Sequence, residues 1–349
     1  MKNVLYINLK FNNHGQRRMD ENIIRELSKD SNVTVVCPEG WYSNEINGAH
    51  YEHYSAETKI KNYRLGEIVK NAKLIKYVNR YRRKNHVDCY FFASYDTLVF
   101  PLWKLLASST LSNSYIVQNN NIDGVINSKK KSKRWVFNLY SRKVNHIVLE
   151  GFIGEFIEKE FSIPHSKIHL LPHPLNSNEC SSQKDFDCVG ISNSNDDEWI
   201  KKIIDIENKE KLFAKNQCKV VLRSNKYSYD DGWLYVFNGW LDDNQYNDYI
   251  NRAKRIFLPY PHTFRYRMSG SVVDAFSNHT SVIGSDIPLF LYYSQKYGDI
   301  CQIVRNPEDL FEVVLKDIDN DQAEDSFIQF IDEHSKKVVR DSIIKALDL

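Results

Sequence analysis

Short apolar strand patterns alternate with helical patterns along the whole chain, and this alternation constrains the fold more than any other feature. Such an order predicts parallel sheets covered by helices on both faces. The expected strands of the first half are 3–9, 33–37, 87–93, 115–118, 146–149 and 167–171. Those of the second half are 186–191, 219–222, 235–237, 255–260 and 281–284.

A proline-rich and then polar stretch, residues 172–185, interrupts the alternation and predicts a domain boundary. The 349 residues suit two domains of roughly 150 residues each. The expected fold class is therefore α/β, with two Rossmann-like, doubly wound parallel-sheet domains facing a cleft. We expect an N-terminal domain over 1–171, a C-terminal domain over 172–323 and a terminal helix over 324–349. Ligands of such sheets bind beyond the carboxyl ends of the strands.

Composition excludes several classes of protein. Hydrophobic residues make up 42% and charged residues 26% of the chain, which is ordinary globular usage. The mean hydropathy is −0.52, and no apolar run predicts a transmembrane helix. The first strand lacks a leader-type cleavage site, so a cytoplasmic protein is expected. The six cysteines form no C-x-x-C pair, and nearby prolines break any helix that would align His165, His169 and His173, so no metal site is predicted.

Charge is distributed unevenly between the two halves. Residues 1–165 carry 25 Lys and Arg against 16 Asp and Glu, whereas the remainder carries 22 against 29. The basic residues gather in 73–84 and in 129–134, and an apolar-aromatic run begins directly afterwards at Trp135. Each group alone is typical of a solvated helix face. Together they predict peripheral contact of the N-terminal domain with an anionic membrane; no nucleic acid partner is expected.

The segment 258–275 carries the strongest chemical signal. A strand ends at Tyr260, arginines follow in the loop, and Ser269-Gly270-Ser271 opens a helix. Free amides at a helix N-terminus bind phosphate, and a glycine allows close approach. A serine there can both cap the helix and donate to a phosphate oxygen. Arg265 and Arg267 would stabilise a diphosphate leaving group.

The order "strand, P-Y, R-x-S-G, helix with D-A, strand V-I-G-S-D, I-P" resembles the donor-binding half of GT-B glycosyltransferases, especially retaining enzymes similar to glycosyltransferase family 4. The stretch 236–241, Val-Phe-Asn-Gly-Trp-Leu, resembles the family's F-x-G-x-L segment. The segment 171–175 resembles the interdomain segment, and the tail resembles the helix that crosses back to the N-terminal domain. This resemblance implies a GT-B fold and a nucleotide-sugar donor.

The resemblance also implies roles for individual residues. Arg223 and Lys226 look like the basic pair that contacts the diphosphate, and with Arg267 they form the implied catalytic set. Two positions depart from the family's paired glutamates, which are eight apart: Tyr266 stands at the first and Asp274 at the second. The donor-binding set implied in this way comprises Ser269, Gly270, Ser271, Asp274, Tyr260, Arg265 and Gly239.

Acceptor-side candidates lie in loops of the first half. The loop 12–17 resembles the glycine-bearing loop that shapes the acceptor site, and Gln118 and Asn119 end another strand. Asp96 and His14 are the candidate bases if the reaction inverts configuration. The full acceptor set is His14, Gly15, Gln16, Asp96, Gln118 and Asn119.

We therefore expect a glycosyltransferase that moves a hexose, with retention of configuration, from a nucleotide-diphosphate sugar to a lipid-linked or oligosaccharide acceptor in surface polysaccharide synthesis. UDP is the expected nucleotide on family frequency. No cofactor and no metal are expected, because basic side chains replace the cation and no suitable loop carries D-x-D. The alternatives are a nucleotide-sugar 2-epimerase of the same fold, or a non-catalytic two-domain protein that binds a ligand or nucleic acid.

Overall fold

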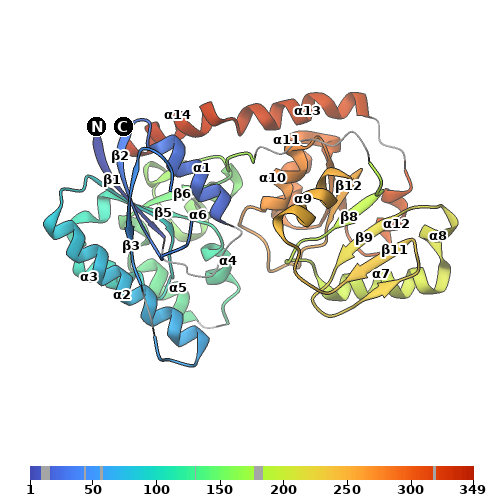
Figure 1. Ribbon diagram of the computed structural model, residues 1–349, viewed down its shortest axis with the longest axis horizontal. Coiled ribbons are helices and arrows are strands. Elements are labelled where there is room, and N and C mark those ends of the chain that lie inside the picture. The colour runs from blue at the N-terminus through green and yellow to red at the C-terminus, as the bar shows by residue number, and fades with distance from the viewer. Residues whose placement is uncertain (9–15, 43–44, 56–57, 130, 177–183, 317–319) are drawn as a thin grey trace. The chain divides into compact units, whose positions relative to one another are not determined.

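The computed structural model describes residues 1–8, 16–42, 45–55, 58–129, 131–176, 184–316 and 320–349, with the side chains of 320–322 excepted. These residues form two compact units (Figure 1). The first unit comprises Met1–Pro174, Tyr266–Met268 and His334–Leu349. The second comprises Leu175–Arg265 and Ser269–Glu333.

The sheet of the first unit has seven parallel strands in the order β3-β2-β1-β4-β5-β6-β7. Its strands are β1 (Lys2–Asn8), β2 (Ser31–Cys37), β3 (Ala49–His53), β4 (Cys89–Ser94), β5 (Ser114–Val117), β6 (Asn145–Val148) and β7 (Ile168–Leu170). Its helices are α1 (Arg17–Leu27), α2 (Tyr63–Lys84), α3 (Pro101–Leu106), α4 (Asn121–Ile126), α5 (Lys131–Asn138), α6 (Gly151–Phe161) and α14 (Lys336–Leu347).

Side-chain alternation along the strands divides the core of this unit into two layers. In β1, Leu5 and Ile7 pack with α2, α3, α5 and α6, whereas Val4 and Tyr6 face the opposite layer with α1 and α14. Period-2 alternation of apolar residues is what a sheet covered on both faces requires. Arg340 of α14 forms a bidentate ion pair with Asp30, with distances of 2.7 Å to both carboxylate oxygens. This pair holds α14 beside the end of α1.

The sheet of the second unit also has seven strands, in the order β10-β11-β9-β8-β12-β13-β14, and only β10 is antiparallel to its neighbour. Its strands are β8 (Cys188–Gly190), β9 (Val220–Arg223), β10 (Tyr229–Asp230), β11 (Leu234–Phe237), β12 (Arg255–Leu258), β13 (Ser281–Ser285) and β14 (Cys301–Val304). Its helices are α7 (Asp197–Glu210), α8 (Leu212–Lys215), α9 (Asp243–Asn251), α10 (Gly270–Ser277), α11 (Pro288–Tyr297), α12 (Asp309–Val314) and α13 (Asn320–Glu333).

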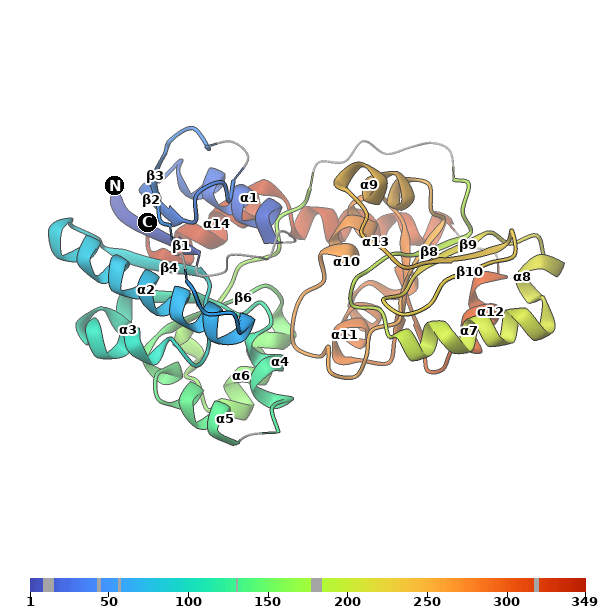
Figure 2. The ribbon, with the colours of Figure 1, turned by 60° about the horizontal axis from the view of Figure 1, so that its bottom comes forward.

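Helices α7, α8 and α12 cover one face of this sheet, where Phe213 stacks on Phe311 with ring centroids 4.4 Å apart (Figure 2). On the other face, Phe276 of α10 packs edge-on against Phe330 of α13 at 5.0 Å. The doubly wound α/β prediction is therefore confirmed for both sheets.

Two secondary-structure expectations need correction. The tail, expected as one long helix over 324–349, is two helices, because the chain leaves α13 at Glu333 and restarts at Ser335, whose side chain caps α14 by accepting from the Val338 amide. Strands β3, β10 and β14 had not been expected. Among the described residues, no helix combines the length and the apolar character needed to span a bilayer.

Candidate functional site

The strand order of the second sheet reverses between β8 and β12, which are neighbours in the sheet but not in sequence. In open α/β sheets, ligands bind at such a switch point, beyond the carboxyl ends of the strands. The chain places Ser192 just after β8 and Tyr260 just after β12. The next strand along, β9, ends at Arg223. The candidate site of the second unit is therefore built from these strand ends and from the start of α10.

Tyr260 joins the strand ends to α10. Its buried hydroxyl donates to Ser192 Oγ at 3.0 Å and shares a 2.8 Å hydrogen bond with Ser269 Oγ. Ser269 is the N-cap residue of α10 by position, but its side chain makes no capping hydrogen bond. The expected capping role of the Ser269 hydroxyl is therefore wrong, because Tyr260 holds that hydroxyl instead.

The first turn of α10 has the geometry of an anion site. A helix N-terminus carries partial positive charge, and here no side chain caps it. A Cβ placed on Gly270 would meet no heavy atom within 4 Å, so the space beside this residue is open. Ser271, one residue further, lies 3.1 Å from the Tyr246 hydroxyl.

Asp274 is engaged within the protein. Its carboxylate accepts from Asn176 Nδ2 at 2.8 Å and from the Tyr246 hydroxyl at 3.1 Å, and the residue is 6% exposed. Burial and the Asp274 charge raise the pKa of Tyr246 well above its usual value, so the phenol stays protonated and donates. Each carboxylate oxygen of Asp274 thus already accepts one internal hydrogen bond, and the expected contact of Asp274 with a donor ribose stays a prediction.

Arg223 is the most unusual cation of this unit. It is only 6% exposed, and its buried Nε has no hydrogen-bond partner among the described residues. Burial lowers its pKa, and no described carboxylate pairs with it. Its guanidinium lies 5.0 Å from the ring of Trp240, a side chain that is itself 82% exposed. A buried, unneutralised arginine at a strand end is the arrangement that a bound anion would complete.

The loop after Arg223 is held by a short hydrogen-bond network. Asp197 accepts from the Ser224 hydroxyl at 2.6 Å and from the Asn225 amide at 2.7 Å. Ser224 Oγ in turn accepts from the amides of Lys226 and Tyr227. The Lys226 ammonium is exposed and lies 3.2 Å from Glu198, which raises its pKa. Lys226 is thus placed near Arg223 in the loop, but its charge is locally balanced.

The two arginines of the loop 261–268 differ in their surroundings. Arg265 is exposed and donates from Nε to the carbonyl of His262 at 2.6 Å. Arg267 forms an ion pair with Asp123 of α4 at 3.0 Å, and the Tyr266 amide donates to the same carboxylate at 2.8 Å. The Arg267 charge is therefore balanced by Asp123, and its expected role at a diphosphate leaving group stays a prediction. Gly239, after β11, has open space around its Cβ position.

The acceptor-side candidates of the first unit are mostly structural. His14 and Gly15 lie outside the described residues, and Gln16 precedes α1 without capping it. Asp96 accepts from the amides of Leu98 and Val99, so it acts as a turn-capping residue. Two amide side chains follow strand β5. Asn119 donates to the Ala93 carbonyl, and Gln118 is fully buried between Tyr95 and His146. The Gln118 side chain is thus engaged inside the first unit, and its expected ligand contact stays a prediction.

Burial makes His146, the neighbour of Gln118, a pH-sensitive group. His146 Nδ1 lies 2.8 Å from Gln118 Nε2, and Nε2 lies 2.7 Å from the Ser141 carbonyl. Gln118 Oε1 accepts from Tyr95, so its amide faces Nδ1 and leaves no acceptor for a second imidazole proton. Burial lowers the pKa of His146 to about 4. His173, buried elsewhere in this unit, also has its pKa lowered to about 4 by burial.

We expect the free energy of unfolding to fall between pH 6.5 and pH 4. Because both folded-state pKa values lie below that of an unfolded histidine, the unfolded chain binds more protons and stability is lost as the pH falls. Each histidine contributes a slope of up to about 1.4 kcal/mol per pH unit. Denaturant titrations at several pH values should show this slope, and His146→Gln should remove about half of it. An equal slope in both proteins would contradict this assignment.

The sequence analysis did not predict three residues of the site. Trp240 entered the sequence analysis only as part of the stretch 236–241, and no role was predicted for Tyr246. Ser192 carries no motif of its own. The signal that could have found them is position, since Ser192 and Trp240 directly follow strands whose carboxyl ends meet at one edge of the sheet.

Solved structures with this fold are numerous. A sucrose-phosphate synthase from Thermosynechococcus elongatus aligns with a TM-score of 0.68 at 10% identity, over 99% of this chain and 98% of that one. LpCGTa in complex with UDP aligns with a TM-score of 0.66 at 7% identity, over 100% and 99%. A glycosyltransferase from Rickettsia africae aligns with a TM-score of 0.64 at 10% identity, over 99% and 98%.

Sequence comparison adds nothing to this structural likeness. No protein-family profile matches the chain, and no curated protein matches it in sequence. The structural likeness over essentially the full length of both chains establishes the fold, which is the GT-B fold of these proteins.

Proposed function

We propose that this GT-B protein is a nucleotide-sugar-dependent glycosyltransferase, and that the second unit holds the nucleoside diphosphate of the donor. The observation that carries the proposal is Arg223. A buried guanidinium with an unpartnered Nε at a switch-point strand end is costly unless an anion completes it. The uncapped start of α10 offers a second group for the same kind of ligand.

The chemistry follows from where charge develops. In glycosyl transfer, the bond between the anomeric carbon and the diphosphate oxygen breaks, and the diphosphate leaves with the electron pair. The acceptor hydroxyl bonds to the anomeric carbon, and its proton passes to an oxygen of the leaving diphosphate. Arg223 and the first amides of α10 would stabilise the charge that grows on the leaving diphosphate. Lys226 would add a mobile cation once it leaves Glu198.

The exposed ring of Trp240 suits the nucleobase. It is 82% exposed and lies against the Arg223 guanidinium, so a base stacked on it would place its diphosphate close to the arginine. LpCGTa was solved in complex with UDP, which supports UDP as the nucleotide. We further propose a hexose donor with retention of configuration, and chemistry without a metal, since basic groups occupy the strand ends where a cation would be needed.

The acceptor belongs to the same proposal. The first 165 residues have nine more basic than acidic residues, the excess of 25 over 16, which favours an anionic acceptor such as a lipid-linked sugar phosphate. An oligosaccharide acceptor in surface polysaccharide synthesis is the related expectation. A role at the inner face of a membrane would follow from a lipid-linked acceptor.

Thermal unfolding with a nucleotide panel tests the proposal. We expect UDP to raise the unfolding temperature, with GDP, ADP and CMP giving smaller shifts, and EDTA to leave the UDP shift unchanged. A ligand at about 100 times its dissociation constant adds roughly 2.7 kcal/mol, which corresponds to several degrees. If no nucleotide shifts the transition, the protein is not a nucleotide-sugar enzyme and the ligand-binding alternatives take its place. A shift abolished by EDTA would contradict the metal-free chemistry.

A further inference from the structure

The chain leading into α2 alternates cations with large apolar side chains on the surface. Residues 59–65 read Lys-Ile-Lys-Asn-Tyr-Arg-Leu, and all seven are exposed. Ile60, Tyr63 and Leu65 are 41%, 69% and 54% exposed. Such side chains would normally be buried, and no acidic residue lies among them. Burial therefore does not account for the apolar side chains of this segment.

Helix α5 presents the same combination. Lys129 and Lys131 are exposed at its start, and Trp135 is 64% exposed. Arg134 differs, because it pairs with Glu160 at 2.7 Å and lies over the Phe161 ring. We refer to residues 59–65, 129 and 131–135 together as the α2–α5 surface.

One charge from each part of the α2–α5 surface acts on the other. Burial lowers the pKa of Lys133, the Asp96 charge opposes that effect, and the Arg64 charge lowers the pKa further. Arg64 of the lead-in segment is therefore within electrostatic range of Lys133 of α5, and both segments belong to the first unit (Figures 1 and 2).

The cations of this surface are not neutralised locally. Lys59, Lys61, Arg64, Lys129 and Lys131 make no ion pair with any residue that the structure describes. The first turn of α2 contains no acidic side chain, and Asn62 caps it by accepting from the Leu65 amide at 3.1 Å. The positive end of the α2 dipole thus adds to the positive charge of five free cations.

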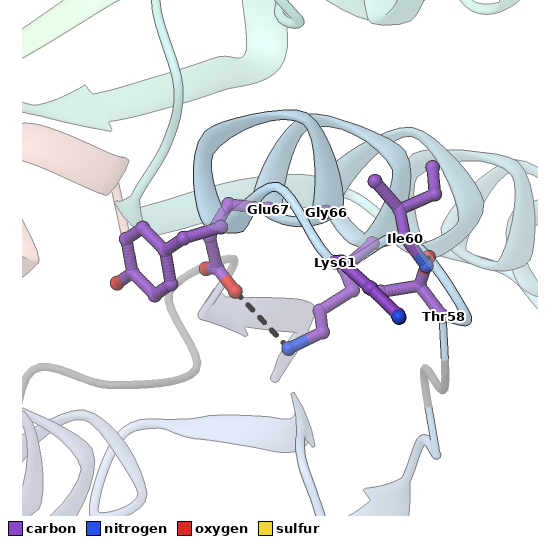
Figure 3. A pocket seen from close by; sticks show the side chains of 7 residues that line it. Thr58, Ile60, Lys61, Gly66 and Glu67 are labelled. Atoms are coloured by element: carbon purple, nitrogen blue, oxygen red, sulfur yellow. Dashed lines mark hydrogen bonds and ion pairs between the residues drawn. The ribbon is translucent and has the colours of Figure 1, made fainter.

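A hollow lies beside this lead-in segment. It has a volume of ≈ 490 Å³ and is lined by Ile60, Lys61 and Tyr63 from the segment and by Gly66, Glu67 and Lys70 from α2, with Thr58 at its edge. Figure 3 shows Ile60 and Lys61 beside the first turns of the helix. Glu67 is paired with Lys70 at 3.1 Å, which leaves Lys61 as the unpaired cation of the hollow.

We propose that the α2–α5 surface docks on an anionic lipid bilayer. Exposed tryptophan and tyrosine side chains favour the headgroup region, aliphatic side chains gain by entering the acyl boundary, and lysines pair with lipid phosphates. The exposed Ile60 and Leu65 distinguish this partner from nucleic acid, because an aliphatic side chain gains little from a phosphate backbone. Shallow insertion plus charge supplies the two signals that stable peripheral binding needs.

Sedimentation with lipid vesicles tests this proposal without any donor or acceptor, so its outcome is independent of the proposed transferase activity. The full chain is mixed with vesicles of phosphatidylcholine alone or with about one-third phosphatidylglycerol, at low salt and at ~0.5 M salt. We expect binding only to the anionic vesicles and loss of most of it at high salt. The triple variant Lys59→Gln/Lys61→Gln/Arg64→Gln should bind at least tenfold more weakly, given about fivefold per cation.

Matched variants distinguish binding by this surface from nonspecific electrostatic binding and from nonspecific hydrophobic binding. Lys73→Gln/Lys76→Gln/Arg80→Gln removes the same charge from exposed positions further along α2 and should change binding by less than about threefold. Trp135→Ala should weaken binding about tenfold, whereas Leu105→Ala, which alters a 79% exposed side chain on α3, should not.

Several outcomes would overturn the proposal. Failure of the wild-type chain to bind anionic vesicles would do so, as would equal losses in the two triple variants. Binding to double-stranded DNA that the Lys59/Lys61/Arg64 variant loses, with no vesicle binding, would assign the surface to nucleic acid instead.

Discussion

Replacing Arg223 by alanine is expected to weaken UDP binding about 100-fold, which corresponds to about 2.7 kcal/mol and matches the loss of charged hydrogen bonds to a diphosphate. The transfer rate should fall by about 10²- to 10³-fold, because the same guanidinium would face the charge that develops on the leaving group. The fold should survive, since Arg223 forms no ion pair with any residue that the structure describes, and its Nε has no hydrogen-bond partner among them. Isothermal titration calorimetry with UDP measures the first effect directly.

Two further variants make the Arg223 result specific. Lys226→Gln should weaken UDP binding only about threefold, because this ammonium is exposed and balanced by Glu198. Arg223→Lys should recover part of the affinity but not all of it, because an ammonium cannot make the paired contacts of a guanidinium. Equal UDP affinity in wild type and Arg223→Ala would remove this residue from the donor site.

Gly190→Ala is expected to lower the unfolding temperature of the second unit by roughly 5–10 °C. A Cβ on Gly190 would lie 2.8 Å from the Phe257 carbonyl oxygen and 2.9 Å from the Leu222 side chain, so the strands must separate. Overpacking of this kind costs about 1–3 kcal/mol, and each kcal/mol corresponds to about 2–4 °C. UDP binding should weaken as well, because Gly190 ends β8 directly before the strand-end residues of the site.

Gly239→Ala is the matched control for this stability effect. The chemical change is the same, but a Cβ on Gly239 would meet no heavy atom within 4 Å. We expect its unfolding temperature to stay within about 1 °C of wild type, as for a surface change away from the core. Differential scanning calorimetry of both variants decides the point, and similar transitions for the two would mean that β8 and β12 tolerate a wider spacing.

The architecture was predictable because it rests on periodicity. Each sheet is buried on both faces, so its central strands are continuous apolar runs that a sequence displays directly. The missed strands lie at the edges, where this signal fades. Strand β3 reads Ala-His-Tyr-Glu-His, and β10 spans only Tyr229–Asp230. Strand β14 follows a 3-10 turn and was hidden by the helical pattern before it.

The positions of the site residues were more predictable than their hydrogen-bond and ion-pair partners. The pattern of a strand followed by a serine-glycine helix start points to Gly270, and the resemblance to GT-B glycosyltransferases points to Arg223. Partners distant in sequence decide the rest, since Arg267 meets Asp123 and Asp274 meets Asn176. No local sequence pattern predicts such pairings. They nevertheless decide which cations remain available to a ligand.

The same limit applies to the polar residues of the first unit. Gln118 ends a strand, as a ligand-binding amide often does, but its side chain fills a buried gap between Tyr95 and His146. Strand-end position alone does not distinguish an amide that faces solvent from one that completes a core network. Burial does, and burial depends on packing among segments far apart in the chain.

Hydrogen–deuterium exchange with and without UDP tests the central claim most directly, because it locates the nucleotide on the chain. We predict that UDP slows exchange in peptides that contain the strand ends after β8, β9 and β11 and the first turn of α10, which are residues 191–196, 223–227, 238–241 and 269–272. The Arg223→Ala variant should lose this protection at the same UDP concentration. Protection confined to the first unit, or unchanged exchange in these four peptides at a UDP concentration that raises the unfolding temperature, would contradict a nucleoside diphosphate site at the switch point of the second sheet.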